Sequence, residues 1–492
     1  MITVLVGIVL VVVVFWLKST YSYWTRKCVP GPEPRWIVGN FGANVIRQKS
    51  LGDIVTELYR KYDGHKIVGI YRMLTPCLLI RDVDVVKTMT IKDFTNFHDN
   101  DIYMDQSSDL IFGGNPFVLK GEDWKEKRTQ ITNAFTSGKI KAMFASMTKG
   151  AKQMIEYLNK TVGDEGKTFE TIDFSSNYTL ETVLICAYGI EVKVFEEPDS
   201  KFVQMGKKLL QPKPLEAFFF YVSMLYPKIT KLLKIRFSNQ GTSEQVFEMI
   251  KAAFDYRDKN NLESKDFLGN LAPLRAVFGE KSVLALAAAF FVDGQATTGL
   301  AMGGILYDLA KNPEVQQKLR EELNEYFEKD KGQLSYESIQ EMPYLDACFK
   351  ESLRMQPVLG FLTKVCTKTY TYTPPDESHP PIVIEKGTPI LLPIHAIHND
   401  PQYFDEPSKY IPERFMDKEM ANTKYFMGFG NGPRACIGRR FGSTQVKTGV
   451  AYLIHNYELS LNPNIKLSKI DPWEFFSVPK DGFRVDFRKL KK

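Results

Sequence analysis

The sequence predicts a mainly α-helical protein with small β-sheets, attached to a membrane by an N-terminal transmembrane anchor. Three features of the chain carry this prediction. Residues 281–310 form one long apolar run without proline, which favours a single buried helix. Residues 382–384 and 389–393 are short aliphatic runs separated by turn-forming residues, a pattern typical of short strands. Residues 1–17 carry no charged side chain and are rich in Val, Ile and Leu.

The membrane anchor is predicted over residues 1–24. At 1.5 Å per residue, its uncharged part spans most of a ~30 Å hydrocarbon core. Tyr21, Tyr23 and Trp24 are predicted to form an interfacial belt. A cleaved signal peptide is the alternative, but the segment lacks a basic start and a small-residue cleavage site. Basic residues follow the anchor, so the positive-inside tendency places the rest of the chain in the cytosol.

Two further units are predicted after the anchor. Residues 25–40 form a basic and proline-rich linker, in which Pro30 to Pro34 is a stiff, non-helical spacer. Residues 41–492 form one large domain, because no Gly/Ser-rich stretch, charge block or internal repeat divides them. Hydrophobic residues make up 44% of the chain, which is enough for a substantial core.

Charge and cysteine content exclude several classes of protein. The 64 basic and 58 acidic side chains give a formal net charge of +6, which is too mild to indicate a nucleic-acid partner. The six cysteines are scattered without CxxC spacing or a secreted framework. Neither a zinc site nor a disulfide scaffold is therefore predicted, and a reducing compartment fits best.

The most informative stretch for function is Phe429 to Gly438, in which three glycines and a proline surround Cys436. Glycines let the backbone approach a planar ligand closely, and the amides after Cys436 are expected to point at its sulfur and lower its pKa. A thiolate held in this way suits an axial ligand of haem iron. Arg434 is expected to pair with a haem propionate as a bidentate donor. The alternative for a lone cysteine is a structural residue in a turn before a helix, but the spacing of Phe429, Arg434 and Gly438 around it is specific.

This stretch resembles the haem-binding loop of the cytochrome P450 superfamily, and other motifs occur in the expected order from Pro30 to the C-terminus. The resemblance is closest to the microsomal group that includes insect detoxification and vertebrate drug-oxidising enzymes. It implies the cytochrome P450 fold, a haem b with Cys436 as the ligand of its iron, and a place at the endoplasmic reticulum membrane. Phe429 and Gly438 would then border the haem.

Other residues acquire a role only through this resemblance. Glu351 and Arg354 lie three apart on one helix face, where a surface ion pair is the simpler interpretation. In the family, they form with Arg414 of Pro412 to Phe415 a buried cluster that braces the haem loop. The resemblance also implies contacts with the haem propionates, made by three residues of this chain: Trp124, Arg128 and Lys364. A solvated basic helix is the alternative for the first two, and Lys364 replaces the arginine that relatives have.

The distal helix departs from the family pattern. Relatives have a small residue, Gly, any residue, an acid and then Thr, whereas this chain has Asp293 to Thr297 with Ala296 at the acid position. Gly294 and Thr297 match the pattern. Asp293 shares a helix face with Thr297, so it is a candidate to replace the missing acid through water, or to charge the distal pocket. Related fatty-acid ω-hydroxylases have at this position a glutamate that can be esterified to haem, but the shorter aspartate makes attachment unexpected here.

Two functions therefore stay open. The first is a monooxygenase that inserts one atom of O2 into a lipophilic xenobiotic, steroid or lipid. Its electrons come from NADPH through NADPH-cytochrome P450 reductase, with cytochrome b5 as an optional second partner. The second is a degenerate haem-thiolate protein, an isomerase or a non-catalytic binding or signalling protein, which Ala296 favours. Substrate specificity is expected to reside in residues 99–112, 212–226, 290–291 and 473–478. The aromatic run within 218–226 fits a second membrane contact and core packing equally well.

Overall fold

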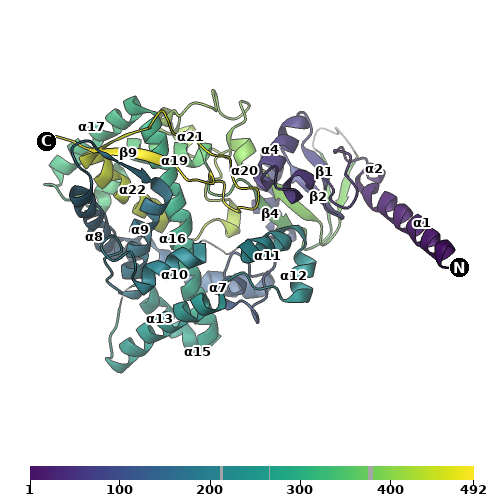
Figure 1. The fold of residues 1–492 in the computed structure, drawn as a ribbon, viewed down its shortest axis with the longest axis horizontal. Helices are drawn as coiled ribbons and strands as arrows, with labels where there is room; N and C mark the ends of the chain where they lie inside the picture. The colour runs from purple at the N-terminus through teal and green to yellow at the C-terminus, as the bar shows by residue number, and fades with distance from the viewer. Residues whose placement is uncertain (211–213, 265, 375–379, 492) are drawn as a thin grey trace.

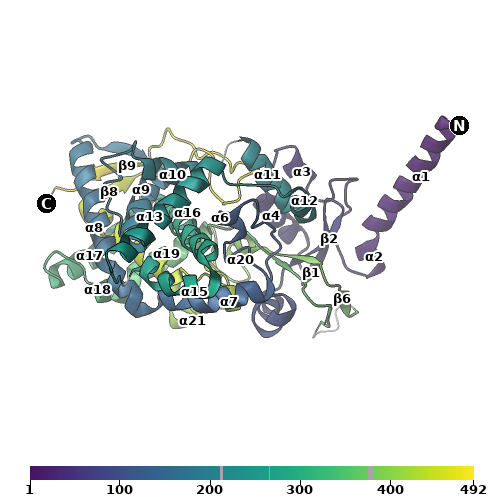
Figure 2. The same cartoon turned by 90° about the horizontal axis from the view of Figure 1, so that it is seen from below.

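The computed structural model describes residues 1–210, 214–264, 266–374 and 380–491. Helices form most of the body, and the small sheets lie at its edges (Figure 1). Helix α1 (Ile2–Tyr21) projects away from the body on the side of the hairpin formed by β1 (Ile67–Arg72) and β2 (Thr75–Ile80), and the C-terminus lies at the opposite end (Figures 1 and 2). The predicted class, mainly α with small β-sheets behind an apolar N-terminal helix, is confirmed. Residues 212 and 213 of one predicted specificity segment lie outside the described residues.

The α-helices follow one another along the chain with short connections. In order they are α1 (Ile2–Tyr21), α2 (Tyr23–Arg26), α3 (Gly42–Val45), α4 (Leu51–Lys61), α5 (Val83–Lys87), α6 (Leu110–Gly113), α7 (Gly121–Thr132), α8 (Ser137–Thr161), α9 (Thr171–Val183), α10 (Lys201–Leu210), α11 (Pro214–Leu225), α12 (Pro227–Leu233), α13 (Gln240–Lys259), α14 (Phe267–Leu271), α15 (Arg275–Phe278), α16 (Glu280–Lys311), α17 (Pro313–Lys329), α18 (Tyr336–Glu341), α19 (Pro343–Met355), α20 (Ile394–His398), α21 (Lys418–Ala421) and α22 (Arg439–Asn456).

The strands form three small sheets. They are β1 (Ile67–Arg72), β2 (Thr75–Ile80), β3 (Lys167–Glu170), β4 (Leu362–Val365), β5 (Tyr370–Tyr372), β6 (Ile382–Ile384), β7 (Pro389–Leu392), β8 (Tyr457–Ser460) and β9 (Arg484–Lys489). The four-stranded sheet has the order β1-β2-β7-β4, with β2 and β7 parallel and the other pairs antiparallel. The other two have the orders β3-β9-β8 and β5-β6. Both predicted strand runs are therefore strands, although they belong to different sheets.

Helix α16 is the long apolar helix that the sequence predicts at residues 281–310. It is long and apolar enough to cross a membrane, but 72% of that window is buried inside the protein. Gly299 and Gly303 face α9, where a side chain would collide with Ser176 and Ile172. Because glycine has no side chain, α9 packs closely on α16 at these two positions. Helix α16 is therefore the core helix beside which the site lies.

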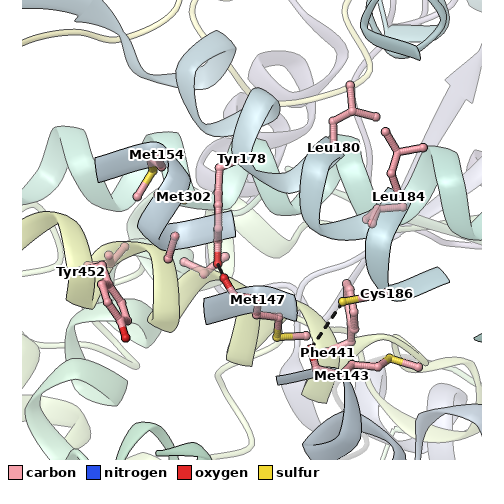
Figure 3. Close-up of a cluster of buried hydrophobic side chains, with 14 of the residues drawn as sticks. Met143, Met147, Met154, Tyr178, Leu180, Leu184, Cys186, Met302, Phe441 and Tyr452 are labelled. Atoms are coloured by element: carbon pink, nitrogen blue, oxygen red, sulfur yellow. Dashed lines mark hydrogen bonds between the residues drawn. The ribbon is translucent and has the colours of Figure 1, made fainter. Parts of the chain in front are cut away.

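A cluster rich in methionine fills the space between α8, α9, α16 and α22 (Figure 3). Tyr178 is fully buried in it, and its hydroxyl donates to the carbonyl of Gln445 at 3.1 Å. Flexible methionines such as Met147 and Met302 fill the irregular gaps around that ring. The cluster holds α22, whose N-terminus carries the cysteine loop, against the helices beside α16.

The connection from α1 to the body is packed, not free. Trp24 is 2% exposed, and its indole N–H donates to the carbonyl of Ile70 at 3.0 Å. Gly69 leaves room for the indole, and a side chain at Gly31 would collide with the Gly69 carbonyl. The predicted interfacial role of Trp24 is wrong, because its ring belongs to the core around β1. Residues in the 25–40 stretch are likewise attached to the sheet: the Gly69 N–H donates to the Pro30 carbonyl at 2.8 Å.

Candidate functional site

The Cys436 loop is shaped by two glycines with positive φ. Gly430 and Gly432 both have φ of 69°, and a side chain at Gly432 would collide with the carbonyl of Thr90. The Cys436 N–H donates to the Phe429 carbonyl at 2.8 Å, which closes the loop. Gly438 then caps the start of α22. The local sequence thus folds into a tight loop that presents one thiol at the N-terminus of a long helix.

The charge of Asp293 acts on the Cys436 thiol, so the two side chains lie near each other between this loop and α16. Both side chains are exposed by surface area, yet burial raises the pKa of each, to about 6 for Asp293. Groups with accessible surface inside a desolvating environment face a cavity and not the outer surface. We call the space bounded by Cys436, Asp293 and Thr297 the central hollow.

The expected lowering of the Cys436 pKa is wrong for the free thiol. Burial is the largest influence and raises its pKa, while the hydrogen bond with the Gly438 amide acts in the predicted direction but is smaller. Burial penalises the thiolate because it removes water from the charged form. A bound metal ion deprotonates a coordinating thiol regardless of this shift.

Arg434 is held by the protein on several sides. Its Nε donates to the His98 carbonyl at 2.7 Å, and its Nη2 lies 3.1 Å from Asp99 Oδ1. Its guanidinium carbon also lies 3.9 Å from the centre of the Trp124 ring, in a cation–π contact. Burial lowers the pKa of Arg434 to about 10, against the opposing effect of Asp99. Arg434 and Trp124 are therefore brought together, although the two were predicted separately.

Arg128 and Lys364 are two further cations around the loop. Arg128, on α7, donates to the Ala435 carbonyl at 2.7 Å, next to Cys436. Lys364, on β4, is 4% exposed, and its Nζ lies 2.8 Å from the amide oxygen of Asn100. Burial, and then Arg434, lowers the pKa of Lys364 to about 7. Among the described residues, no carboxylate forms an ion pair with Lys364.

Glu351, Arg354 and Arg414 form one buried cluster beside the loop. Arg354 donates to both oxygens of Glu351, at 2.8 and 2.9 Å, and Arg414 Nε donates to Glu351 Oε1 at 3.1 Å. The cluster also binds backbone, because Arg354 Nη1 donates to the His398 carbonyl at 2.8 Å. The ring of His398 in turn accepts the Met427 N–H at 2.8 Å, which connects the cluster to the segment before Phe429.

The distal residues lie on a regular stretch of α16. The helix runs without interruption through Gly294, and Thr297 Oγ1 donates to the carbonyl of Asp293 at 2.7 Å. Ala296 is buried, at 4% exposure, and carries no ionisable group. Asp293 is the acidic side chain that the described structure places in the hollow, and the Asn115 amide nitrogen donates to its Oδ2 at 2.9 Å.

Sequence reasoning missed Asn115 and His398. Asn115 lies in the connection after α6, 178 positions from Asp293, and His398 ends α20. Neither residue stands in a motif with a spacing that indicates chemistry. Their partners are set by tertiary packing, so the sequence holds no local signal for either contact.

The sequence model of the family described as cytochrome P450 matches residues 29–487. The chain belongs to the cytochrome P450 family. It is similar to probable cytochrome P450 6a19 of Drosophila melanogaster, with 34% identity over 470 residues and 92% of each chain covered. Cytochrome P450 6B2 of Helicoverpa armigera is 29% identical over 502 residues, with 98% of this chain and 97% of the relative covered. Probable cytochrome P450 28a5 of D. melanogaster is 30% identical over 511 residues, with 100% and 99% covered.

Membership makes this protein a haem-thiolate monooxygenase that binds haem b through a cysteine thiolate, and the insect relatives fit the microsomal class. Two observations in the structure fit such a group. Cys436 presents its sulfur to an interior hollow, and Lys364 is a buried cation that forms no ion pair with a carboxylate of the described residues. A buried cation of this kind is stabilised by an anionic group such as a propionate. Arg434 fits this role less well than predicted, because its Nε, Nη1 and Nη2 all donate to protein oxygens.

Proposed function

We propose that this cytochrome P450 is anchored in the endoplasmic reticulum membrane with residues 41–492 in the cytosol, and that it oxygenates a lipophilic small molecule. Its electrons would come from NADPH through NADPH-cytochrome P450 reductase, with cytochrome b5 as an optional partner. The observation that carries the proposal is the central hollow, in which Cys436 and the α16 residues Asp293 and Thr297 face one interior space.

Each site residue has a role in this proposal. Haem, when bound, supplies the iron chemistry that activates O2. Cys436 would hold the iron, and Phe429 and Gly438 shape the loop around the cysteine. Lys364 and Arg128 would offer positive charge to the propionates, and Trp124 and Asp99 hold the Arg434 side chain in place. The buried cluster of Glu351, Arg354 and Arg414 would brace the loop through His398, which binds the segment before Phe429.

Proton supply is assigned to two atoms on one face of α16. Thr297 carries a hydroxyl proton on Oγ1, and the Asp293 carboxyl carries a proton on a fraction of molecules near neutral pH, because burial raises its pKa to about 6. A group with a pKa near the working pH is suited to proton transfer. Gly294, between them, lies against Val183, where an added Cβ would be 3.3 Å from the nearest methyl carbon, so the glycine allows close packing of α16 on α9.

Membrane attachment is supported by exposed apolar side chains beside the anchor. The window in α1 has a mean hydropathy of 2.5 and is 6% buried. Trp36 and Ile37, just after α2, are 55% and 61% exposed, and Leu232 of α12 is 80% exposed. The aromatic run of α11 combines both predicted roles, because Tyr221 is buried and Phe218 is 41% exposed. Isolated apolar patches of this kind mark membrane or protein contacts.

The degenerate function is the second candidate, and Ala296 is the observation that favours it. The Ala296 side chain, which is 4% exposed, has no exchangeable proton to deliver. An isomerase or a binding protein needs no proton delivery to O2, so the absence of the acid would not impair it. In a monooxygenase the same absence would divert electrons into released superoxide or peroxide.

The thiolate is tested by the carbon monoxide difference spectrum of the reduced protein. The wild type is expected to show the thiolate-type Soret band, and Cys436→Ala is expected to lose it. Cys366→Ala, which alters a buried cysteine directly after β4, is the matched control and should keep the band. An unchanged band in Cys436→Ala would refute the assignment.

Electron use separates the two candidate functions. Purified protein with reductase and NADPH is screened against lipophilic compounds, and product is compared with NADPH consumed. Substrate-dependent NADPH consumption with product supports the monooxygenase. Consumption that stays at the background of reductase alone for every compound, with haem fully bound, would favour the isomerase or binding function. Orientation is tested by protease access in sealed microsomes, where a protected body would refute the cytosolic placement.

A further inference from the structure

The Asp293 carboxylate is held in one orientation by Asn115. The Asn115 amide oxygen accepts the Phe117 N–H at 2.7 Å, which fixes the direction of the amide. Its nitrogen therefore points at Asp293 and donates to Oδ2 at 2.9 Å. Asn115 itself is 4% exposed, so this support is rigid. One oxygen of the carboxylate is thus occupied, and the carboxylate cannot turn away from the hollow.

The second oxygen, Oδ1, has no hydrogen-bond partner among the residues that the structure describes, and no basic side chain there forms an ion pair with Asp293. The nearby cations are engaged elsewhere: Arg434 pairs with Asp99, and Arg128 donates to the Ala435 carbonyl. Buried charges in proteins are normally paired, because a buried charge loses its hydration, and this loss costs on the order of several kcal/mol per ion. Among the described residues, Asp293 is therefore a carboxylate with one neutral hydrogen-bond donor and no basic ion-pair partner.

Aromatic side chains pack against the segment that carries Asn115. Phe112 and Phe117 flank Asn115 in the chain, and both are partly buried members of an apolar cluster that also includes Phe220 of α11. Further partly buried members of the same cluster are Phe219, Phe361 and Phe475. Aromatic faces attract a cation as well as apolar groups. A ligand with an apolar body and one positive charge matches both parts of this environment.

We infer that the central hollow selects lipophilic cations, molecules with an apolar body and a single protonated or quaternary amine whose charge pairs with the Asp293 carboxylate. This inference rests on the proposed function and names its substrate class. Neutral lipophiles of the same shape would leave the carboxylate unpaired, and lipophilic anions would be repelled by it. Asn115 is the positioning residue, since it aims the carboxylate without contacting the ligand charge.

The test uses a pair of probes with the same shape and different charge. Trimethyl(4-phenylbutyl)ammonium carries a permanent charge and cannot ligate iron, and (5,5-dimethylhexyl)benzene is its uncharged isostere. The dissociation constants of both are measured with the haem-loaded enzyme, by equilibrium dialysis and by the Soret shift. The quantity of interest is the ratio of the two constants, because the ratio removes differences in apolar contact and in haem loading.

Asp293→Asn removes the charge and keeps the shape. It is expected to weaken cation binding relative to the isostere by about tenfold, which corresponds to about 1.4 kcal/mol. Asp293→Glu should retain part of the preference. Glu280→Gln, at the exposed start of the same helix, makes the same chemical change outside the hollow and should leave the ratio unaltered. Asn115→Ala should reduce the preference by a smaller factor than Asp293→Asn.

An equal ratio in wild type and Asp293→Asn would overturn the inference and leave Asp293 as a proton carrier only. That failure differs from failure of the proposed function. A protein that shows the thiolate Soret band and consumes NADPH with a neutral lipophile, yet has no charge preference, refutes the cation subsite alone. A protein with the preference but without NADPH consumption refutes the monooxygenase and keeps the subsite.

Discussion

Glu351 and Arg354 form a bidentate ion pair from which solvent is fully excluded: both side chains have 0% exposure, with N–O distances of 2.8 and 2.9 Å. Neighbours three apart on a helix usually form exposed pairs that contribute little. Here the pair also accepts Arg414 and the Ile411 N–H. Because these partners come from the segment after α20, the pair connects α19 to the chain that leads into the cysteine loop.

Breaking this pair is expected to be strongly destabilising. Arg354→Leu leaves the Glu351 carboxylate buried with a single arginine, and the free energy of unfolding should fall by about 3–5 kcal/mol. The measurement is denaturant unfolding together with haem occupancy. Glu406→Gln is the matched control, since it breaks the exposed Glu406–Lys409 pair and should cost less than ~1 kcal/mol. Full haem occupancy and wild-type stability in Arg354→Leu would contradict the proposed brace.

Truncation at the N-terminus should have two different outcomes, depending on whether Trp24 is kept. Deleting residues 2–20 removes most of α1 and should release much of the protein from membranes without loss of stability. Deleting residues 2–27 also removes the buried Trp24 indole, and the free energy of unfolding should fall by about 3–5 kcal/mol. Membrane sedimentation and thermal unfolding are the two measurements. Trp36→Ala, at an exposed indole, is the control and should not destabilise the protein.

The sequence was sufficient where a pattern is local. Long apolar runs and short aliphatic runs predicted α16, β6 and β7 because helix and strand formation depends on neighbours in the chain. The family motifs brought Trp124, Arg434 and Cys436 to attention, and the fold places them around one loop. These predictions needed no knowledge of distant contacts.

The sequence was insufficient where distant segments meet. Tryptophan is a residue type typical of membrane interfaces. The Trp24 ring is nevertheless buried, because Gly69 on β1 has no side chain in the space that the indole occupies. The sign of the Cys436 pKa shift was also wrong, because the loop amides are a local influence whereas burial comes from the whole fold. The Asn115–Asp293 hydrogen bond joins two segments that no spacing rule connects.

Lys364 should have opposite effects in the haem-free and haem-bound protein. Lys364→Met removes a buried cation without a carboxylate partner among the described residues, so the haem-free protein should become more stable at pH 7 or below. The same change removes positive charge available to a propionate, so haem should dissociate about tenfold faster. Haem transfer to excess apomyoglobin and unfolding of the haem-free form are the two measurements. Lys364→Arg, which keeps the charge, should retain haem, and equal retention in Lys364→Met would refute contact with a propionate.

Restoring the distal acid should improve the use of electrons. Ala296→Glu supplies a carboxyl at the position where relatives have one, so the ratio of product to NADPH consumed should rise. Loss of a general acid lowers the rate of the step that it catalyses by a factor on the order of 10²–10⁴. Asp293 and water would recover part of that loss in the wild type. Ala301→Glu, on an adjoining turn of α16, is the control and should not raise the ratio. Tight coupling already in the wild type, unchanged by Ala296→Glu, would show that Asp293 is sufficient.

The link between the Glu351 cluster and the cysteine loop should be sensitive to acid through His398. Burial, and then the charge of Arg354, lowers the pKa of His398 to about 3, and its Nε2 accepts the Met427 N–H in the neutral form. Since the unfolded histidine binds a proton below about pH 6.5, stability from this residue is complete above pH 6.5 and declines as the pH falls towards 3. His398→Gln keeps an acceptor of similar reach but does not titrate. The stability advantage of the wild type over this variant should therefore shrink by on the order of 2 kcal/mol between pH 6.5 and 4, measured by urea unfolding at each pH. Using the difference removes the contribution of the buried carboxyls, such as Asp308, whose raised pKa acts in the opposite direction. A difference that is constant over this range would show that His398 is not held neutral by its environment.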